Sequence, residues 1–250
     1  MPARPTAPPA GGLGWANLGL DIVSVNRVRG LLAAYGEEFF DRMLDPGELA
    51  DCRTSSGLDV LSLCGRIAAK EAAFKTLRVR GRLLPWRDIV VRRSDGGWPL
   101  VRLRSTAADM AADSGITEIT VSISHDVDYA VAVAAPVLGL PSDPRPGSPS
   151  PPPSSRPSTS RSTSSSRSTP MTDGLQQVKD WILKRHPERE DLATDVDLIE
   201  NRLIDSLSFV EFVFLLEQLS GKPIEMETLE VDAIRTLDAI ERTFFRAEVR

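Results

Sequence analysis

Apolar positions in the first 140 residues follow two different periods. Segments with apolar residues three and four positions apart are typical of helices, and they alternate with segments that are typical of strands. The expected strands are residues 18–25, 87–93, 100–104, 118–124 and 129–134, and the expected helices are residues 27–35, 37–44, 62–77 and 105–114. Asp95-Gly96-Gly97 is a turn sequence that predicts a hairpin between two of the strands. The pattern as a whole predicts an α+β unit with a largely antiparallel sheet.

Residues 141–170 contain no aliphatic or aromatic side chain. They comprise nine Pro, twelve Ser, three Thr, four Arg, one Asp and one Gly. Burial of apolar surface therefore cannot offset the entropy that is lost when such a segment becomes ordered. We expect a disordered, partly extended linker with a root-mean-square reach of roughly 30 Å.

After this segment the apolar spacing is helical throughout. The expected helices are residues 175–184, 206–219, 231–234 and 236–245. Leu207, Val210 and Phe214 recur at helical spacing in the second of them. The predicted architecture of this part is a small all-α bundle of four helices.

Charge is distributed unevenly along the chain, whose formal net charge is −5. Residues 1–140 carry 16 Lys and Arg and 16 Asp and Glu, whereas residues 173–250 carry 10 and 18, a net charge of −8. An acidic helical unit suits a partner surface rich in arginine. No basic stripe is interleaved with aromatic residues, so we do not expect nucleic-acid binding.

Neither a membrane nor an oxidising compartment is expected from the sequence. The apolar runs are too short to span a bilayer, and the first residues lack the apolar core of a signal peptide. Cys52 and Cys64 offer neither a disulfide framework nor metal-ligand spacing. We expect a cytoplasmic protein with two reduced thiols.

Two acidic residues lie within apolar sequence and are candidates for metal binding. Asp21 is near the end of the first expected strand, and Glu71 is in the middle of the helix expected over residues 62–77. Mg²⁺ is usually held by one or two carboxylates together with water and substrate phosphates. A pair of carboxylates would therefore suit a site that handles a diphosphate. The alternative is a structural ion pair, for example between Asp21 and an arginine, and this arrangement is more common.

The helix that carries Glu71 also carries cations. Lys75 follows Glu71 by four residues and so lies on the same face, either as an ion-pair partner or as a contact for phosphate oxygens. Arg66 precedes Glu71 by five residues. His125 is one of two histidines and lies where an expected strand meets a turn, a position that suits either a structural role or a phosphate contact.

Ser206 begins the second helix of the C-terminal part. A serine at this position is by default an N-cap. Helix N-termini also favour anionic groups, so a phosphodiester on this hydroxyl would be stabilised electrostatically. The acidic residues around it, which include Asp205 and Glu211, give the helix a surface for a basic partner.

The N-terminal motifs occur together in the order and spacing of a known family. They are residues 19–23, 66–74, 95–99 and 122–125. Over about residues 17–136 the chain resembles holo-acyl-carrier-protein synthase, the small class of phosphopantetheinyl transferase. Gly57-Leu58 stands where this family often has a basic pair. A basic loop at residues 78–82 replaces a glycine-rich loop, and it would either supply the missing charge or be a solvated loop.

The resemblance implies a transferase that moves the 4′-phosphopantetheine arm of coenzyme A to a carrier serine and releases adenosine 3′,5′-bisphosphate. It implies that Asp21 and Glu71 ligate Mg²⁺ and that Lys75 contacts the transferring phosphate. It also implies that Arg66 and His125 bind coenzyme A. A homotrimer with active sites between subunits is implied as well. Arg27, in the first helix, matches a basic position that meets the acidic helix of the carrier.

The C-terminal part resembles acyl carrier domains over about residues 173–247, and Ser206 matches the serine that carries 4′-phosphopantetheine. The resemblances together imply a transferase domain at residues 17–138, a linker at 139–172 and a carrier domain at 173–247. We expect the enzyme to modify its own Ser206, in cis or in trans. Other carrier proteins are further candidate acceptors. Such activity would support fatty acid or polyketide-type biosynthesis.

Several alternatives remain open at this stage. Either Glu71 or a metal-bound water could accept the serine proton. The N-terminal unit could also be a degenerate transferase that only docks and trimerises a carrier modified by another enzyme, as the Gly57-Leu58 difference would suggest. A structural adaptor is a third possibility, against which Asp21, Glu71, Lys75 and Ser206 argue together.

Overall fold

The computed structural model describes residues 17–79, 82–138, 173–226 and 228–246. The chain divides into two compact units. The first contains residues up to 138 and also the short segments 205–212 and 225–228, and the second contains most of the other residues after position 172. The linker expected over residues 139–172 lies outside the described residues, as does residue 247 of the expected carrier domain.

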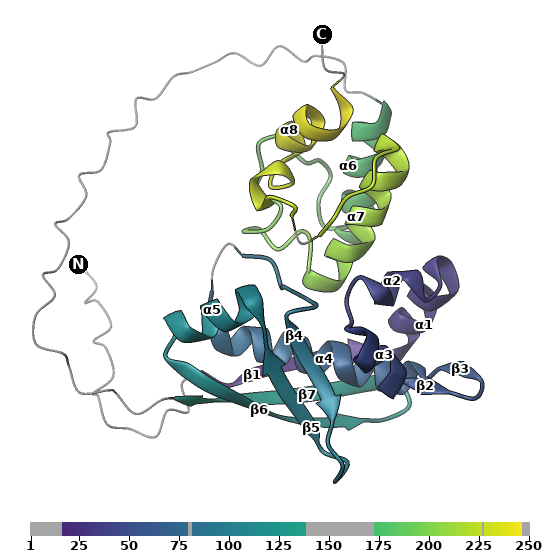
Figure 1. The fold of residues 1–250 in the computed structure, drawn as a ribbon. Coiled ribbons are helices and arrows are strands. Elements are labelled where there is room, and N and C mark those ends of the chain that lie inside the picture. The colour runs from purple at the N-terminus through teal and green to yellow at the C-terminus, as the bar shows by residue number, and fades with distance from the viewer. Residues whose placement is uncertain (1–16, 80–81, 139–172, 227, 247–250) are drawn as a thin grey trace, which may run out of the picture. The chain divides into compact units, whose positions relative to one another are not determined.

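A three-stranded antiparallel sheet organises the first unit. Its strands are β1 (Gly19–Ser24), β7 (Tyr129–Leu138) and β6 (Ile116–His125), in the order β1-β7-β6 (Figure 1). Helix α4 (Val60–Leu77) packs against all three strands. The predicted α+β unit with an antiparallel sheet is therefore confirmed.

Small residues allow α4 to approach this sheet closely. The buried alanines in the contact are Ala68, Ala69, Ala72 and Ala73 on α4, and Ala130, Ala132 and Ala134 on β7. On β1 the corresponding residue is Gly19, where an added Cβ atom would lie 1.9 Å from the Ala72 carbonyl oxygen. Side chains alternate along a strand, so Asp21 projects on the same side as Gly19, toward α4. The close packing thus places Asp21 beside the helix that carries Glu71.

One helix and four short elements lie between β1 and α4 in the chain. Helix α1 (Val25–Tyr35) begins after Ser24, whose side chain accepts a hydrogen bond from the Arg27 backbone. The connecting elements are α2 (Glu38–Asp41), α3 (Pro46–Asp51), β2 (Arg53–Thr54) and β3 (Gly57–Leu58). The helix expected over residues 37–44 is thus shorter than predicted, and α3 and the β2–β3 hairpin were not predicted.

The remaining elements of this unit follow the expected order. Strands β4 (Ile89–Arg93) and β5 (Pro99–Leu103) form an antiparallel hairpin in which Arg93 pairs with Pro99. Helix α5 (Ser105–Asp113) leads from this hairpin to β6. The hairpin predicted from Asp95-Gly96-Gly97 is confirmed.

A fully buried ion pair fixes α4 to the short elements. The Lys70 ammonium donates hydrogen bonds to the Glu48 carboxylate at 2.7 Å and to the carbonyl oxygens of Met43 and Trp86 at 3.0 and 2.7 Å. The other Glu48 oxygen accepts a hydrogen bond from the Val91 backbone at 2.7 Å. Since every charge in this network has partners, the helix is held in one position relative to α3 and β4.

The described residues of the C-terminal part form helices. They are α6 (Asp173–Arg185), α7 (Ser206–Ser220), a 3-10 turn (Val231–Ala233) and α8 (Leu237–Ile240), which continues as a π-helical turn (Glu241–Phe245). Within the described residues, no helix has both the length and the apolar character that crossing a membrane requires.

Candidate active site

Asp21 and Lys75 form an ion pair between β1 and α4. The Lys75 ammonium donates hydrogen bonds to Asp21 Oδ1 and to the Leu20 carbonyl oxygen, each at 2.8 Å. Burial raises the pKa of Asp21, and the hydrogen bond from Lys75 opposes this effect. The ion-pair alternative considered for Asp21 thus occurs in part, with a lysine as the partner instead of an arginine.

Glu71 lies next to this pair and is the most strongly perturbed carboxyl group of the site. Burial, reinforced by the nearby charge of Asp21, raises the pKa of Glu71 to about 7. Lys75 and a hydrogen bond from Ser206 act in the opposite direction. A carboxyl group with such a pKa can hold or release a proton near neutral pH, as general acid–base chemistry requires.

The first residues of α7 belong to the same compact unit and bring a hydroxyl group to Glu71. Ser206 Oγ donates a hydrogen bond to Glu71 Oε2 at 3.0 Å. Asp205 is the residue that caps the helix, because its carboxylate accepts a hydrogen bond from the Ser208 backbone at 2.6 Å. The Ser206 side chain is therefore not used as the N-cap.

Arg27 holds the residues on both sides of Ser206. Its guanidinium donates two hydrogen bonds to the Asp205 carboxylate, each at 3.1 Å, and one to Ser208 Oγ at 2.7 Å. Burial would raise the pKa of Asp205, but the hydrogen bonds from Arg27 and Ser208 outweigh burial and lower it. The carboxylate of Asp205 thus both caps α7 and binds a planar cation in a bidentate manner.

The donor set at Asp21 and Glu71 fits a divalent cation of the Mg²⁺ type. Among the described residues, no group of three or more His, Cys, Asp or Glu could hold a metal on its own. Two adjacent carboxylates that each have a raised pKa nevertheless form a site whose negative charge a cation would neutralise. Mg²⁺ often binds in this way, with one or two carboxylates and with the remaining positions taken by water and substrate phosphate.

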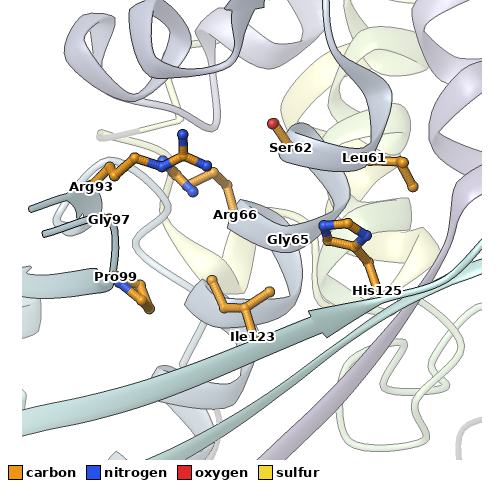
Figure 2. A pocket seen from close by; sticks show the side chains of 9 residues that line it. All are labelled: Leu61, Ser62, Gly65, Arg66, Arg93, Gly97, Pro99, Ile123 and His125. Carbon is orange, nitrogen blue, oxygen red and sulfur yellow. The ribbon is translucent and has the colours of Figure 1, made fainter.

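A separate pocket of about 160 Å³ lies at the other end of α4. The side chains around it, shown in Figure 2, are Leu61, Ser62, Gly65, Arg66, Arg93, Gly97, Pro99, Ile123 and His125. Three of them can be cationic and come from different elements, namely Arg66 from α4, Arg93 from β4 and His125 from β6. The structure thus brings together Arg66 and His125, which the sequence analysis had assigned to coenzyme A binding, and adds Arg93.

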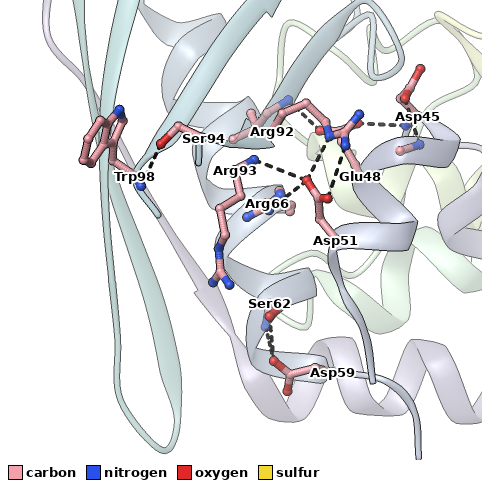
Figure 3. A network of polar contacts seen from close by, with 12 residues as sticks. Asp45, Glu48, Asp51, Asp59, Ser62, Arg66, Arg92, Arg93, Ser94 and Trp98 are labelled. Atoms are coloured by element: carbon pink, nitrogen blue, oxygen red, sulfur yellow. Dashed lines mark hydrogen bonds and ion pairs between the residues drawn. The ribbon is translucent and has the colours of Figure 1, made fainter. Parts of the chain in front are cut away.

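Asp51 organises the polar side of this pocket (Figure 3). Its carboxylate accepts hydrogen bonds from the Arg92 side chain at 2.8 and 3.2 Å and from the Arg93 backbone at 3.2 Å, and it lies 3.7 Å from the Arg66 guanidinium. The Arg92 hydrogen bond contributes most to lowering the pKa of Asp51. Asp51 therefore carries the negative charge that holds these arginines near one another.

Sequence reasoning missed Asp51 and Arg93 as members of a site. The Asp45–Glu48 capping box, with Pro46 at the first helical position, would have predicted α3 and hence placed Asp51 at its end. Arg93 carries no local signal, because its place depends on the β4–β5 hairpin. The loop expected to supply charge is only partly described, since Arg80 lies outside the described residues.

Comparison with known proteins identifies the family of the N-terminal part. Residues 17–134 match the sequence profile of the 4′-phosphopantetheinyl transferase superfamily. The holo-[acyl-carrier-protein] synthase of Halothermothrix orenii is 36% identical over 115 residues, which cover 46% of this chain and 91% of that protein. The corresponding protein of Desulforudis audaxviator is 38% identical over 120 residues, which cover 48% of this chain and 91% of that protein.

Among solved structures, the chain is similar to the crystal structure of Helicobacter pylori holo-[acyl-carrier-protein] synthase in complex with coenzyme A. The two are 29% identical, with a TM-score of 0.41, and the match covers 48% of this chain and 99% of that chain. The family assignment rests on the sequence relatives. This chain belongs to the 4′-phosphopantetheinyl transferase superfamily and is an enzyme of the holo-[acyl-carrier-protein] synthase type.

Proposed function

We propose that this enzyme transfers the 4′-phosphopantetheine arm of coenzyme A, with Mg²⁺, to Ser206 of its own chain. The observation that carries the proposal is the hydrogen bond from Ser206 Oγ to Glu71, beside Asp21 and Lys75. The residues from 173 onward would then be an acyl carrier domain, and its loaded arm would serve fatty acid or polyketide-type biosynthesis.

The reaction joins the serine oxygen to the β-phosphorus of coenzyme A. Ser206 Oγ forms the new P–O bond as the bond from that phosphorus to the bridging oxygen breaks, and adenosine 3′,5′-bisphosphate leaves. The hydroxyl proton passes to Glu71, to which the hydroxyl already donates a hydrogen bond. Glu71 Oε2 lies 3.0 Å from the hydroxyl oxygen and is thus within the hydrogen-bond reach that a general base requires.

Cations balance the charge of the diphosphate during this step. Mg²⁺ held by Asp21 and Glu71 would supply Lewis-acid stabilisation of the phosphate oxygens. The Lys75 side chain, which is partly exposed and pairs with Asp21, would supply a second positive charge to the phosphate group. Arg27 orients the acceptor by holding Asp205 and Ser208 on either side of Ser206.

The sheet carries a surface that suits the homotrimer implied by the family resemblance. Leu20 and Ile22 of β1 are 60% and 61% exposed, and Tyr129 and Val133 of β7 are also exposed. Leu20 lies opposite Val133, and alternation places these side chains on the face of the sheet that α4 does not cover. Contact with another subunit would remove this apolar surface from water.

Intact-mass measurement tests the proposal directly. Full-length protein, incubated with coenzyme A and Mg²⁺, should gain the mass of one phosphopantetheine arm. Ser206→Ala should gain none, because it lacks the acceptor oxygen. Glu71→Gln keeps the size of the side chain but lacks its carboxylate, so it should load at least 100-fold more slowly, within the range expected for loss of a general base.

Two results would contradict the proposal. Loading that persists in Ser206→Ala would refute the acceptor assignment. If wild-type protein loads neither itself nor a discrete bacterial acyl carrier protein, the alternative of a degenerate docking module would replace an active transferase. Ser220→Ala, a change at the other end of α7, is the matched control and should load like wild type.

A further inference from the structure

The two lysines of α4 differ in how freely they can change partners. Lys70 is fully buried and donates hydrogen bonds to three acceptors, which fix its position. The Lys75 side chain is 47% exposed, whereas that of its ionic partner Asp21 is 15% exposed. A lysine carries its charge at the end of a flexible four-carbon stem. Lys75 is therefore the member of the Asp21–Lys75 pair that can move to another anion.

The ammonium of Lys75 occupies an oxygen that a metal ligand would have to offer. It donates hydrogen bonds of 2.8 Å to Asp21 Oδ1 and to the Leu20 carbonyl oxygen. Asp21 cannot withdraw from α4, because the strand that carries it is packed against the helix at Gly19. A cation shared by Asp21 and Glu71 would lie next to the ammonium, and like charges at such short range repel each other. In this position Lys75 thus opposes metal binding.

A diphosphate at this site would offer Lys75 a different partner. An ammonium can exchange a carboxylate oxygen for a phosphate oxygen and still make a charge-assisted hydrogen bond. Asp21 would then lose its counter-charge while Glu71 lies beside it, and two neighbouring carboxylates without a cation are unfavourable. A divalent cation would balance both of them. The arrival of a diphosphate would therefore both free the metal ligand and increase the need for a metal.

We infer that Lys75 is an internal counter-cation that occupies Asp21 until coenzyme A binds, and that its move to the diphosphate makes the binding of Mg²⁺ and coenzyme A cooperative. The inference rests on the proposed function for the position of the diphosphate. Cooperativity of this kind is reciprocal, so coenzyme A raises the affinity for Mg²⁺ by the same factor as Mg²⁺ raises the affinity for coenzyme A. Without coenzyme A the metal competes with the ammonium for Asp21, and with coenzyme A it does not.

Calorimetric titration of Mg²⁺ with and without saturating coenzyme A tests this inference, and a titration into coenzyme A alone serves as the blank. Every protein is full-length and carries Ser206→Ala, so that no arm is transferred during the measurement. Without coenzyme A, the added change Lys75→Gln should tighten Mg²⁺ binding about 10-fold, because the metal no longer displaces a charged hydrogen bond. With coenzyme A, it should not tighten Mg²⁺ binding, since Lys75 has already left Asp21 in the parent protein.

Two further variants serve as controls. Lys75→Arg keeps the positive charge and should retain the weak Mg²⁺ binding of the parent in the absence of coenzyme A. Arg78→Gln removes an exposed positive charge three residues further along, at the C-cap of α4, and should leave both affinities unchanged. Equal tightening by Lys75→Gln with and without coenzyme A would reduce its effect to general charge repulsion. That result, or no tightening in either state, would overturn the inference.

Loading of Ser206 in the wild-type enzyme, measured separately, distinguishes a failure of this inference from a failure of the proposed function. If Ser206 is loaded and either overturning result is obtained, only the role of Lys75 is refuted. If Lys75→Gln tightens Mg²⁺ binding only without coenzyme A, while the wild type never loads Ser206, the coupling holds and self-modification is refuted. Circular dichroism should show an unchanged fold in each variant, because both substituted side chains are exposed.

Discussion

At the scale of single residues, the site combines acidic groups that would repel each other if both were charged. Asp21 and Glu71 both have raised pKa values, with burial as the leading cause in each case. Lys75 neutralises Asp21 directly through a hydrogen bond of 2.8 Å. Glu71 is left with the larger shift, and its protonation state should therefore control both the stability and the activity of this site.

Glu71→Gln should stabilise the metal-free protein at alkaline pH. The folded-state pKa of Glu71 is about 7 and its unfolded value is 4.5, so its stabilising contribution is complete below pH 4.5 and is lost as the pH rises through 7. A glutamine at this position cannot ionise, so its contribution to the stability of the folded protein does not change with pH. At pH 8 the free energy of unfolding of the variant should thus exceed that of wild type by up to about 3 kcal/mol, and the variant should unfold at a higher temperature. At pH 4.5 the two proteins should unfold at nearly the same temperature.

Thermal unfolding at a series of pH values, with chelator present, measures this difference. Added Mg²⁺ should raise the unfolding temperature of wild type more than that of Glu71→Gln, because only the wild-type carboxylate is available as a ligand. A constant difference between the two proteins from pH 4.5 to pH 8 would show that Glu71 ionises in the folded protein as it does in the unfolded chain.

The sequence allowed some of these residues to be found but not others. Asp21 and Glu71 could be singled out because a carboxylate in apolar sequence is unusual, and the strand and helix periods placed both in regular elements. Arg93 could not be found, because an arginine at the end of a strand is ordinary. Its proximity to Arg66, which is 27 residues away in the chain, depends on tertiary structure. So does the contact of its backbone with Asp51, which is 42 residues away.

At the scale of elements, long periodic segments were predicted well and short ones were not. β1, α1, α4 and the β4–β5 hairpin lie close to their expected positions. α3 and the β2–β3 hairpin were missed, since six- and two-residue elements contain too few positions to establish a period. The helix α3 is stabilised by a tertiary contact, the buried Lys70–Glu48 pair, which sequence spacing does not reveal.

The exposed face of β1 and β7 gives a prediction about assembly. Ile22→Lys places a charge in the middle of the proposed subunit contact, where burying it without a partner is strongly unfavourable. We expect wild-type protein to have the mass of a trimer by light scattering and Ile22→Lys to have that of a monomer. Val127→Lys is the control, since Val127 is 77% exposed in the turn between β6 and β7 and should leave the mass unchanged.

Two results of that measurement would contradict the prediction. A monomeric wild-type protein would exclude the trimer. A trimeric Ile22→Lys variant would show that subunits associate through some other surface. Circular dichroism of both variants distinguishes dissociation from unfolding, because Ile22 is exposed and its substitution should leave the helix content unchanged.

At the scale of the whole molecule, the chain contains both the proposed donor site and the proposed acceptor. The homologous match ends at residue 134, while Ser206 lies 72 residues further on. The change in composition after residue 140 predicts a boundary between these two parts. What the sequence could not predict is the contact of Ser206 with Glu71, since it joins residues 135 positions apart and depends on tertiary structure.

Complementation between two inactive variants distinguishes transfer within a chain from transfer between chains. Glu71→Ala retains Ser206 but lacks the proposed base, and Ser206→Ala retains the base but lacks the acceptor. If wild-type loading is intramolecular, its rate should not change with protein concentration, because a tethered acceptor has an effective concentration of about 1 mM. An equimolar mixture of the variants at 1 μM should then load Glu71→Ala far more slowly, at a rate that rises with protein concentration. A mixture that loads as fast as wild type at every concentration would instead assign the transfer to neighbouring subunits of one assembly. In that case, loaded Glu71→Ala should appear only after the two mixed variants have exchanged subunits.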